Sequence, residues 1–193
     1  MWAGAGNAPC ANHGIGAVAI SPYLFVASSA SWTSAPDGGL SHVFAALAES
    51  LRVISQWEAQ YKAALAPYKL PLIAYEGGQS LVGASTRSMQ NLFVSANRDA
   101  RMQTVYTTLL NDWRSQGGQM FTAYASIYAP NEYGEWGALE SFMDTVYPLS
   151  SAPPKWQALQ NFISSTPCWW PGCVGRVELP SVATLVAPVR AIK

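Results

Sequence analysis

The apolar residues of this chain repeat with two different spacings. Short apolar runs at 16–25, 70–75 and 119–128 are typical of buried strands. The segment between the first two runs instead carries apolar residues every three or four positions, which predicts a long amphipathic helix. Its apolar positions are Leu40, Val43, Phe44, Leu47, Leu51, Ile54, Trp57, Tyr61 and Leu65.

Two further helices are expected downstream. One begins at Asn97, a residue type that caps helices, and ends at Gly117 and Gly118. Its apolar face consists of Met102, Val105, Leu109 and Trp113. The other covers 154–163, and its inward residues are expected to be Trp156, Leu159, Phe162 and Ile163. Strand, loop and helix thus occur three times in order, the pattern of parallel βα units in an α/β fold.

The length of 193 residues predicts one domain, placed at 1–173. Residues 174–193 show no clear period and are expected to form an irregular tail. Only 11% of the residues are charged, and eleven basic side chains balance eleven acidic ones without forming a basic stripe. Nucleic acid is therefore not an expected partner. Polar, Gly and Pro residues interrupt every long apolar stretch, so a membrane span is not expected either.

Three cysteines are present, Cys10, Cys168 and Cys173. In the segment "CWWPGC" a Pro-Gly pair offers a tight turn that brings the two flanking thiols, Cys168 and Cys173, within bonding distance, which predicts a disulfide and an oxidising compartment. Two alternatives stay open: a metal site in which Cys10 and His13 join that pair, or plain buried thiols. No basic, apolar leader begins at Met1, so a secreted or periplasmic location assumes a leader that this chain does not contain.

One acid stands out in a chain with so few charges. Glu76 ends the apolar run of "LIAYEGGQSL" and is followed at once by Gly77 and Gly78. In a barrel of parallel βα units the carboxyl ends of the strands line the active site, and glycines there let the backbone approach a ligand closely. Glu76 is therefore the leading candidate for chemistry, with capping of the next turn or an Arg pair as the structural alternative.

The segments "AVAISPYLF", "LPLIAYEGGQSLVG", "RDARMQTVYTTLLNDWRSQGGQMFTAY" and "GEWGALES", followed by "PKWQALQNFI", resemble the C-terminal part of a clan A glycoside hydrolase, a retaining (β/α)₈ barrel. More narrowly, they are similar to bacterial cellulase-like or cellulose-binding proteins with a Tyr-Glu-Gly-Gly-Gln segment. The resemblance spans about residues 15 to 165 and implies a partial TIM barrel made of strands six to eight. It implies no cofactor and no metal.

The resemblance also assigns roles to individual residues. Glu76 corresponds to the nucleophile at the end of the seventh strand, and Trp136 to the aromatic floor of the sugar subsite. Tyr23 corresponds to an aromatic residue at the end of the sixth strand, which contacts the nucleophile or the sugar. Tyr75 and Gln79, beside the nucleophile, are expected to bind substrate. Packing roles remain the alternative for Tyr23 and Trp136.

The chain departs from the family in what it lacks. A whole barrel takes about 250 residues, so the first five units are missing, and the general acid with them. The Asn131-Glu132 pair looks like the family's acid motif but lies in the wrong unit, where a loop role is expected. The resemblance thus implies a part of a hydrolase that acts on cellulose-like β-glycan, inactive alone, whose open strand edges pair with the missing barrel portion or with a second copy.

The sequence leaves two alternative functions open. The same aromatic cleft suits a non-catalytic carbohydrate-binding or structural module. An unrelated open α/β enzyme is the third reading, although the sequence has neither a glycine-rich phosphate loop nor a G-x-S-x-G elbow with a suitably placed His.

Overall fold

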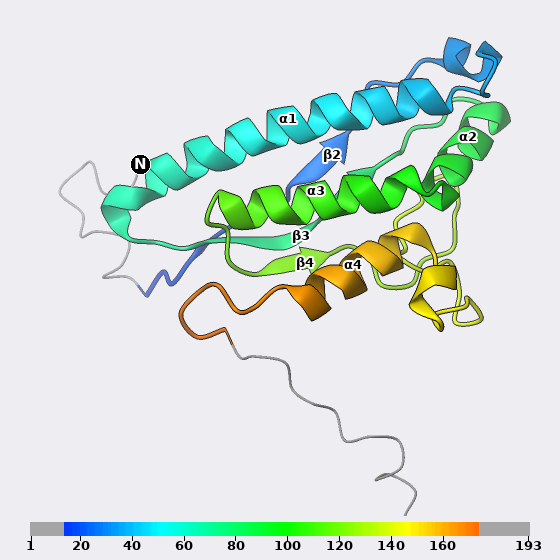
Figure 1. Ribbon diagram of the computed structural model, residues 1–193. Helices are drawn as coiled ribbons and strands as arrows, with labels where there is room; N and C mark the ends of the chain where they lie inside the picture. The colour runs from blue at the N-terminus through cyan, green and yellow to red at the C-terminus, as the bar shows by residue number, and fades with distance from the viewer. Residues whose placement is uncertain (1–13, 174–193) are drawn as a thin grey trace, which may run out of the picture.

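The computed structural model describes residues 14–173 and shows within them a small parallel sheet with four α-helices (Figure 1). The strands are β1 (Val18–Ile20), β2 (Tyr23–Phe25), β3 (Leu72–Ser80) and β4 (Phe121–Ala123). The helices are α1 (Leu40–Leu65), α2 (Arg87–Arg98), α3 (Arg101–Ser115) and α4 (Pro154–Ser165). Short 3-10 turns are η3 (Ala30–Ser34), η4 (Ala66–Tyr68) and η5 (Leu149–Ser151). The α/β class is confirmed; the predicted tail 174–193, Cys10 and His13 lie outside the described residues.

Strand β3 is the centre of the sheet. Strands β1 and β2 follow each other along one side of it and β4 pairs with the other side, all in parallel. The strand predicted at 16–25 is thus two short strands. Pro22 has no amide hydrogen to donate to a sheet, and the amide of Tyr23 donates to the carbonyl of Ser21 at 2.9 Å instead of to a neighbouring strand. Within residues 14–173, neither outer edge of the sheet pairs with a further strand.

The end predicted for the second strand is wrong, because β3 continues past Glu76 to Ser80. The pairing of β3 with β4 shifts between Ala74 and Gly77, so Glu76 lies at an irregularity inside the strand. Such irregularities redirect side chains relative to the regular alternation of a strand. Gly77 pairs with Ala123 of β4 and Gly78 with Tyr23 of β2, so both glycines lie within the strand.

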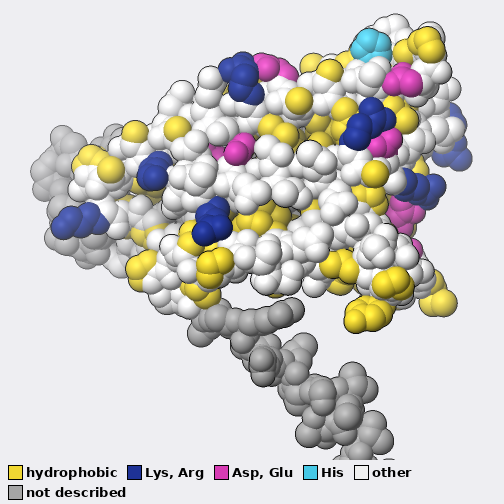
Figure 2. All heavy atoms as spheres, viewed as in Figure 1, with side chains coloured by type: hydrophobic (Ala, Val, Ile, Leu, Met, Phe, Trp, Pro, Cys, Tyr) yellow, Lys and Arg dark blue, Asp and Glu magenta, His cyan; other side chains and the backbone are white. Residues whose placement is uncertain are grey.

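Helices α1 and α3 run side by side along one side of the strands (Figure 1). Leu72 and Ala74 of β3 pack against Trp113 of α3, which forms a small core cluster beneath the helices. Tyr75 follows Ala74 but is not part of this cluster, and its side chain is 53% exposed. On the helix side, charged side chains of both signs lie scattered among apolar ones over α1 and α3 (Figure 2).

The helix predicted from Asn97 is in fact preceded by another helix. Asn97 lies in the last turn of α2, where its side-chain amide donates to the carbonyl of Phe93 at 3.0 Å. Thr86 caps α2 by accepting a hydrogen bond from the amide of Met89 at 3.2 Å. The polar composition of this stretch hid the apolar residues, spaced three and four apart, that α2 buries. These are Met89, Leu92, Phe93 and Ala96.

The predicted inward face of the last helix is also partly wrong. Lys155 and Ala158 are the buried residues of α4, whereas Ile163 is 59% exposed. The buried row of α1 likewise includes a charge, because Glu58 is only 1% exposed while the expected core residue Trp57 is 50% exposed. Both helices therefore bury a charged side chain at an apolar position of their repeat.

The disulfide prediction is confirmed. Cys168 and Cys173 are bonded to each other beyond the end of α4, with their Cα atoms 5.6 Å apart. Between them, the indole of Trp169 donates a hydrogen bond to the carbonyl of Gly118 at 2.8 Å, which ties the loop to the turn after α3. Because both sulfurs are bonded, this pair provides no thiolates for a metal site. No helix of the described part of the chain has the length and apolarity of a membrane span.

Candidate functional site

Glu76 and Tyr23 lie close together where β3 runs beside β2. Burial raises the pKa of Tyr23 well above its usual value, and the negative charge of Glu76 raises it further. The phenol therefore stays protonated beside the carboxylate. Sequence reasoning placed both residues here, and the structure brings them together.

Trp136 lies against Tyr23 from the loop that follows β4. Its ring meets Tyr23 edge to face, with centroids 5.5 Å apart, and meets Tyr124 in the same way at 5.7 Å. Edge-to-face geometry is favourable for aromatic rings and fixes their relative orientation. Three aromatic rings from different segments thus form a wall, and one of them, Tyr23, lies next to Glu76. The sequence analysis did not identify Tyr124 as a site residue, because no local sequence feature shows that the end of β4 faces β2.

Trp136 is held in place by its own loop. The indole N–H donates to the carbonyl of Tyr133 at 3.0 Å. Gly134 has a φ of 135°, and a Cβ atom at this position would lie 2.7 Å from the indole nitrogen. Glycine is therefore required on both conformational and steric grounds for the ring to lie where it does.

The glycines after Glu76 have a different role from the one expected. A Cβ atom on Gly77 would lie 2.8 Å from the Phe121 ring, and one on Gly78 would lie 2.7 Å from the Tyr106 hydroxyl. They leave room for the protein's own side chains rather than for a ligand. The Tyr106 hydroxyl in turn accepts a hydrogen bond from the amide of Gln79 at 3.2 Å, which fixes the backbone after Glu76.

The other two predicted substrate contacts lie apart from this group. Gln79 is fully buried, and its side chain bonds to backbone at both ends: its Nε2 donates to the carbonyl of Glu135 at 2.6 Å, and its Oε1 accepts from the amide of Leu81 at 2.6 Å. It braces the loop of Trp136 instead of facing a ligand. Tyr75 lines a separate cavity of about 310 Å³ together with Trp57 of α1.

No second carboxyl group is found beside Glu76 in the described chain. Glu132 is exposed in the turn that is closed by hydrogen bonds between Asn131 and Gly134, which agrees with the loop role expected for it. Glu135 is buried, but the charges that act on it are those of Lys155 and Glu140. Across residues 14–173, no cluster of three or more His, Cys, Asp or Glu side chains has the arrangement of a metal site.

This arrangement suits two kinds of chemistry. A carboxylate beside a protonated phenol can attack an electrophilic carbon or stabilise positive charge. The adjacent aromatic wall can pack on the apolar faces of a sugar ring. Within the described residues, no second carboxylic acid is found beside Glu76 to protonate a leaving oxygen as a retaining glycosidase requires.

Comparisons with protein families, with curated proteins and with solved structures found no match to this chain.

Proposed function

We propose that this chain is the C-terminal portion of a retaining glycoside hydrolase that acts on a cellulose-like β-glycan. In this proposal it supplies the nucleophile, Glu76, and part of the sugar subsite, formed by Tyr23 and Trp136. The observation that carries the proposal is the proximity of Glu76 to the Tyr23 phenol, against which Trp136 packs edge to face. All three side chains come from different βα units, as residues of a barrel active site do.

The order of the strands supports a partial (β/α)₈ barrel. The segment of β1 and β2, then β3, then β4 are neighbours in the sheet in their chain order, and all are parallel. Helices α1 and α3 connect them and contact the sheet. Consecutive parallel neighbours with intervening helices are the repeating unit of such a barrel, here proposed as units six to eight.

The surfaces at the outer edges of the sheet support an incomplete barrel. Beside β1, the cavity lined by Trp57, Tyr61 and Tyr75 opens at the edge of the sheet. On the side of β4, a cavity of about 860 Å³ is lined mainly by apolar side chains, Met120, Phe162 and Trp170 among them. In a closed barrel the first five units would cover both surfaces. A second copy of the chain is the alternative occupant.

The disulfide supports a secreted or periplasmic location for this activity, because such bonds persist in oxidising compartments. A polysaccharide substrate fits that location.

The proposal is tested with an aryl fluoroglycoside of cellobiose that carries a dinitrophenolate leaving group. This probe needs a nucleophile but little acid assistance, and labelling needs only one event per molecule. We expect mass spectrometry to find one fluoroglycosyl group on the peptide that contains Glu76. Glu76→Gln should abolish the label, and the matched control Glu132→Gln should keep it.

A second candidate, a non-catalytic carbohydrate-binding module, is favoured by the aromatic wall and by the missing second carboxyl group. It predicts saturable binding of cello-oligosaccharides without any label on Glu76. If the chain showed neither saturable binding of cello-oligosaccharides nor a label on Glu76, both functions would be contradicted.

A further inference from the structure

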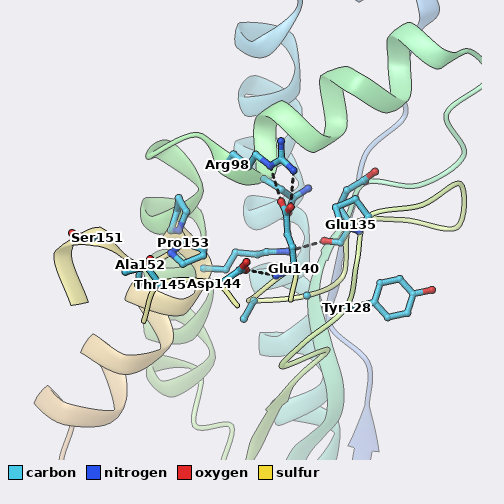
Figure 3. A pocket seen from close by; sticks show the side chains of 15 residues that line it. Arg98, Tyr128, Glu135, Glu140, Asp144, Thr145, Ser151, Ala152 and Pro153 are labelled. Atoms are coloured by element: carbon cyan, nitrogen blue, oxygen red, sulfur yellow. Dashed lines mark hydrogen bonds and ion pairs between the residues drawn. The ribbon is translucent and has the colours of Figure 1, made fainter. Parts of the chain in front are cut away.

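Two buried side chains from distant parts of the chain hold the backbone carbonyl of Glu135. Gln79 of β3 donates to this oxygen at 2.6 Å, and the ammonium group of Lys155 donates to it at 2.7 Å. Figure 3 marks the second bond with a dashed line to Glu135. The peptide group that contains this carbonyl links Glu135 to Trp136. The two donors therefore fix the backbone from which the Trp136 side chain projects.

The peptide group on the other side of Trp136 is held as well. The carbonyl of Trp136 accepts a hydrogen bond from the amide of Ala125 at 3.1 Å. Because both flanking peptides are fixed, the direction of the Cα–Cβ bond of Trp136 is fixed too. The edge-to-face contacts of its ring with Tyr23 and Tyr124 depend on this direction.

Lys155 occupies a position that does not favour folding. Its side chain is 3% exposed, and burial of an ammonium group is costly. The residue is also in the first turn of α4, where a cation faces the positive end of the helix dipole. An apolar side chain at this position would avoid both costs. A buried cation placed here therefore points to a role beyond packing.

Lys155 and Glu135 line a cavity of about 410 Å³ between the end of α2, the loop after β4 and the start of α4 (Figure 3). Burial lowers the pKa of Lys155 to about 7, against the opposing effect of the negative charges of Glu135 and Glu140. Burial also raises the pKa of the Glu135 carboxyl to about 7. The ionisable side chains around Lys155 come from the loop after β4, from α2 and from α3. They are Glu135, Glu140, Asp144, Arg98 and Tyr106, whose ring centroid is 6.0 Å from the ammonium nitrogen.

We propose that Lys155 is a positioning residue for Trp136 and that the charge of Lys155 sets how firmly this ring of the aromatic wall is held. An ammonium group makes a charge-assisted hydrogen bond, which is roughly twice as strong as the bond from a neutral amine. The peptide between Glu135 and Trp136 is therefore held more tightly below about pH 7 than above it. The inference rests on the proposed function only in assigning Trp136 to a sugar subsite.

The test follows Trp136 in the full chain by NMR, with isotope-labelled lysine and tryptophan; loss of a signal in Trp136→Phe assigns the indole. In the parent, the Lys155 and Trp136 signals should titrate with a common midpoint near pH 7. Nuclear Overhauser effects from the indole to Tyr23 and Tyr124 should weaken above that midpoint. Lys155→Met keeps the aliphatic stem without the donor and should weaken them already at about pH 6. Lys62→Met, the same change at an exposed position, should not.

Glu135→Gln separates the effect of Lys155 from that of the neighbouring carboxyl group. The variant keeps the backbone carbonyl but removes a negative charge that raises the pKa of Lys155. The titration of Trp136 should therefore persist, with its midpoint moved to lower pH. Loss of the titration in this variant would overturn the inference. So would independent titration of Lys155 and Trp136 in the parent, a result that does not depend on whether Lys155→Met folds.

Binding of cellotetraose distinguishes this inference from the proposed function. In the parent, the sugar should bind about threefold or more tightly at about pH 6 than at about pH 8, and Lys155→Met should remove that difference. If the sugar does not bind while the Trp136 signals follow Lys155, the proposed function fails and the positioning role stands. If the sugar binds but the Trp136 signals do not follow Lys155, the positioning role alone fails.

Discussion

Tyr23 lies beside Glu76, and burial together with the negative charge of that carboxylate raises the pKa of the Tyr23 phenol. We expect Tyr23→Phe to remove the hydroxyl group, keep the ring contact with Trp136, and slow labelling of Glu76 by the fluoroglycoside probe by about tenfold or more. The rate of mass gain on the Glu76 peptide is the measurement. Tyr133→Phe, the same change at a residue that is 71% exposed, is the matched control. An unchanged rate in Tyr23→Phe would show that the phenol does not assist the carboxylate.

The chain alone should not hydrolyse natural β-glycans. Their alkoxide leaving groups need a proton donor, and the described chain has no second carboxyl group beside Glu76. Cellulose, xylan and mannan oligosaccharides are the substrates to assay, together with aryl glycosides as the most permissive case. Glu76→Gln serves as the contamination control. Turnover of the natural oligosaccharides that this variant abolishes would mean that the chain finds its acid internally or in a second copy.

Glu58 should make the stability of this chain depend on pH. Both of its carboxylate oxygens are buried without partners, and burial, with a smaller contribution from the charge of Asp112, raises its pKa from 4.5 to about 8. The folded state therefore holds a proton that the unfolded state releases. The resulting penalty is absent below the unfolded pKa, grows as the pH rises from 4.5 towards 8, and is constant above that.

Glu58→Gln removes this titration. It should leave stability nearly unchanged at about pH 4 and raise it by a few kcal/mol, as an order of magnitude, at about pH 7. Denaturant unfolding at the two pH values measures the difference. Glu49→Gln is the control, because Glu49 is exposed and its hydrogen bond with Arg52 lowers rather than raises its pKa. An equal effect of Glu58→Gln at both pH values would contradict the assignment.

Gln79 should matter for stability rather than for ligand contact. Gln79→Leu removes the donor to the Glu135 carbonyl and the acceptor for the amide of Leu81. We expect a loss of about 2 kcal/mol or more in the free energy of unfolding. Gln103→Leu, on a partly exposed position of α3, should have little effect. If both variants unfold at the same denaturant concentration as the parent, the bracing role of Gln79 is wrong.

The disulfide should be seen directly by mass spectrometry. The non-reduced peptide that spans Cys168 and Cys173 should be lighter by two hydrogens than its reduced form, since the two sulfurs are bonded. Closure of so short a loop is expected to stabilise the fold by about 2 kcal/mol in the chain-entropy treatment. Cys168→Ser with Cys173→Ser measures that value. Alkylation of both thiols in protein that was never reduced would contradict the bond.

The sequence predicted α1, α3, α4 and the segments that hold the strands, because apolar runs and three-to-four spacing reflect burial directly. The prediction was wrong where the usual meaning of a residue type did not hold in this fold. Gly77 and Gly78 were expected to let the backbone approach a ligand, but their missing side chains make room for Phe121 and Tyr106 inside a longer strand. The polar composition of α2 concealed its narrow apolar face.

The candidate site was predictable only in part. Glu76 is conspicuous in a chain that is 11% charged, but the approach of Tyr124 to Trp136 depends on how distant segments fold together. The buried charges did leave a signal. Glu58 and Lys155 occupy positions in the apolar repeats of their helices, where a charge marks either an error in the assignment or an unusual environment.

The fixed indole of Trp136 has a consequence for the entropy of binding. Its hydrogen bond to Tyr133, its edge contacts with Tyr23 and Tyr124, and the close approach of Gly134 already restrict its rotamers in the free protein. Ordering a mobile side chain on binding costs about 0.5 to 1.5 kcal/mol. A ligand that packs against Trp136 avoids that loss. Even a small contact area with this ring is therefore expected to contribute nearly its full favourable free energy to binding.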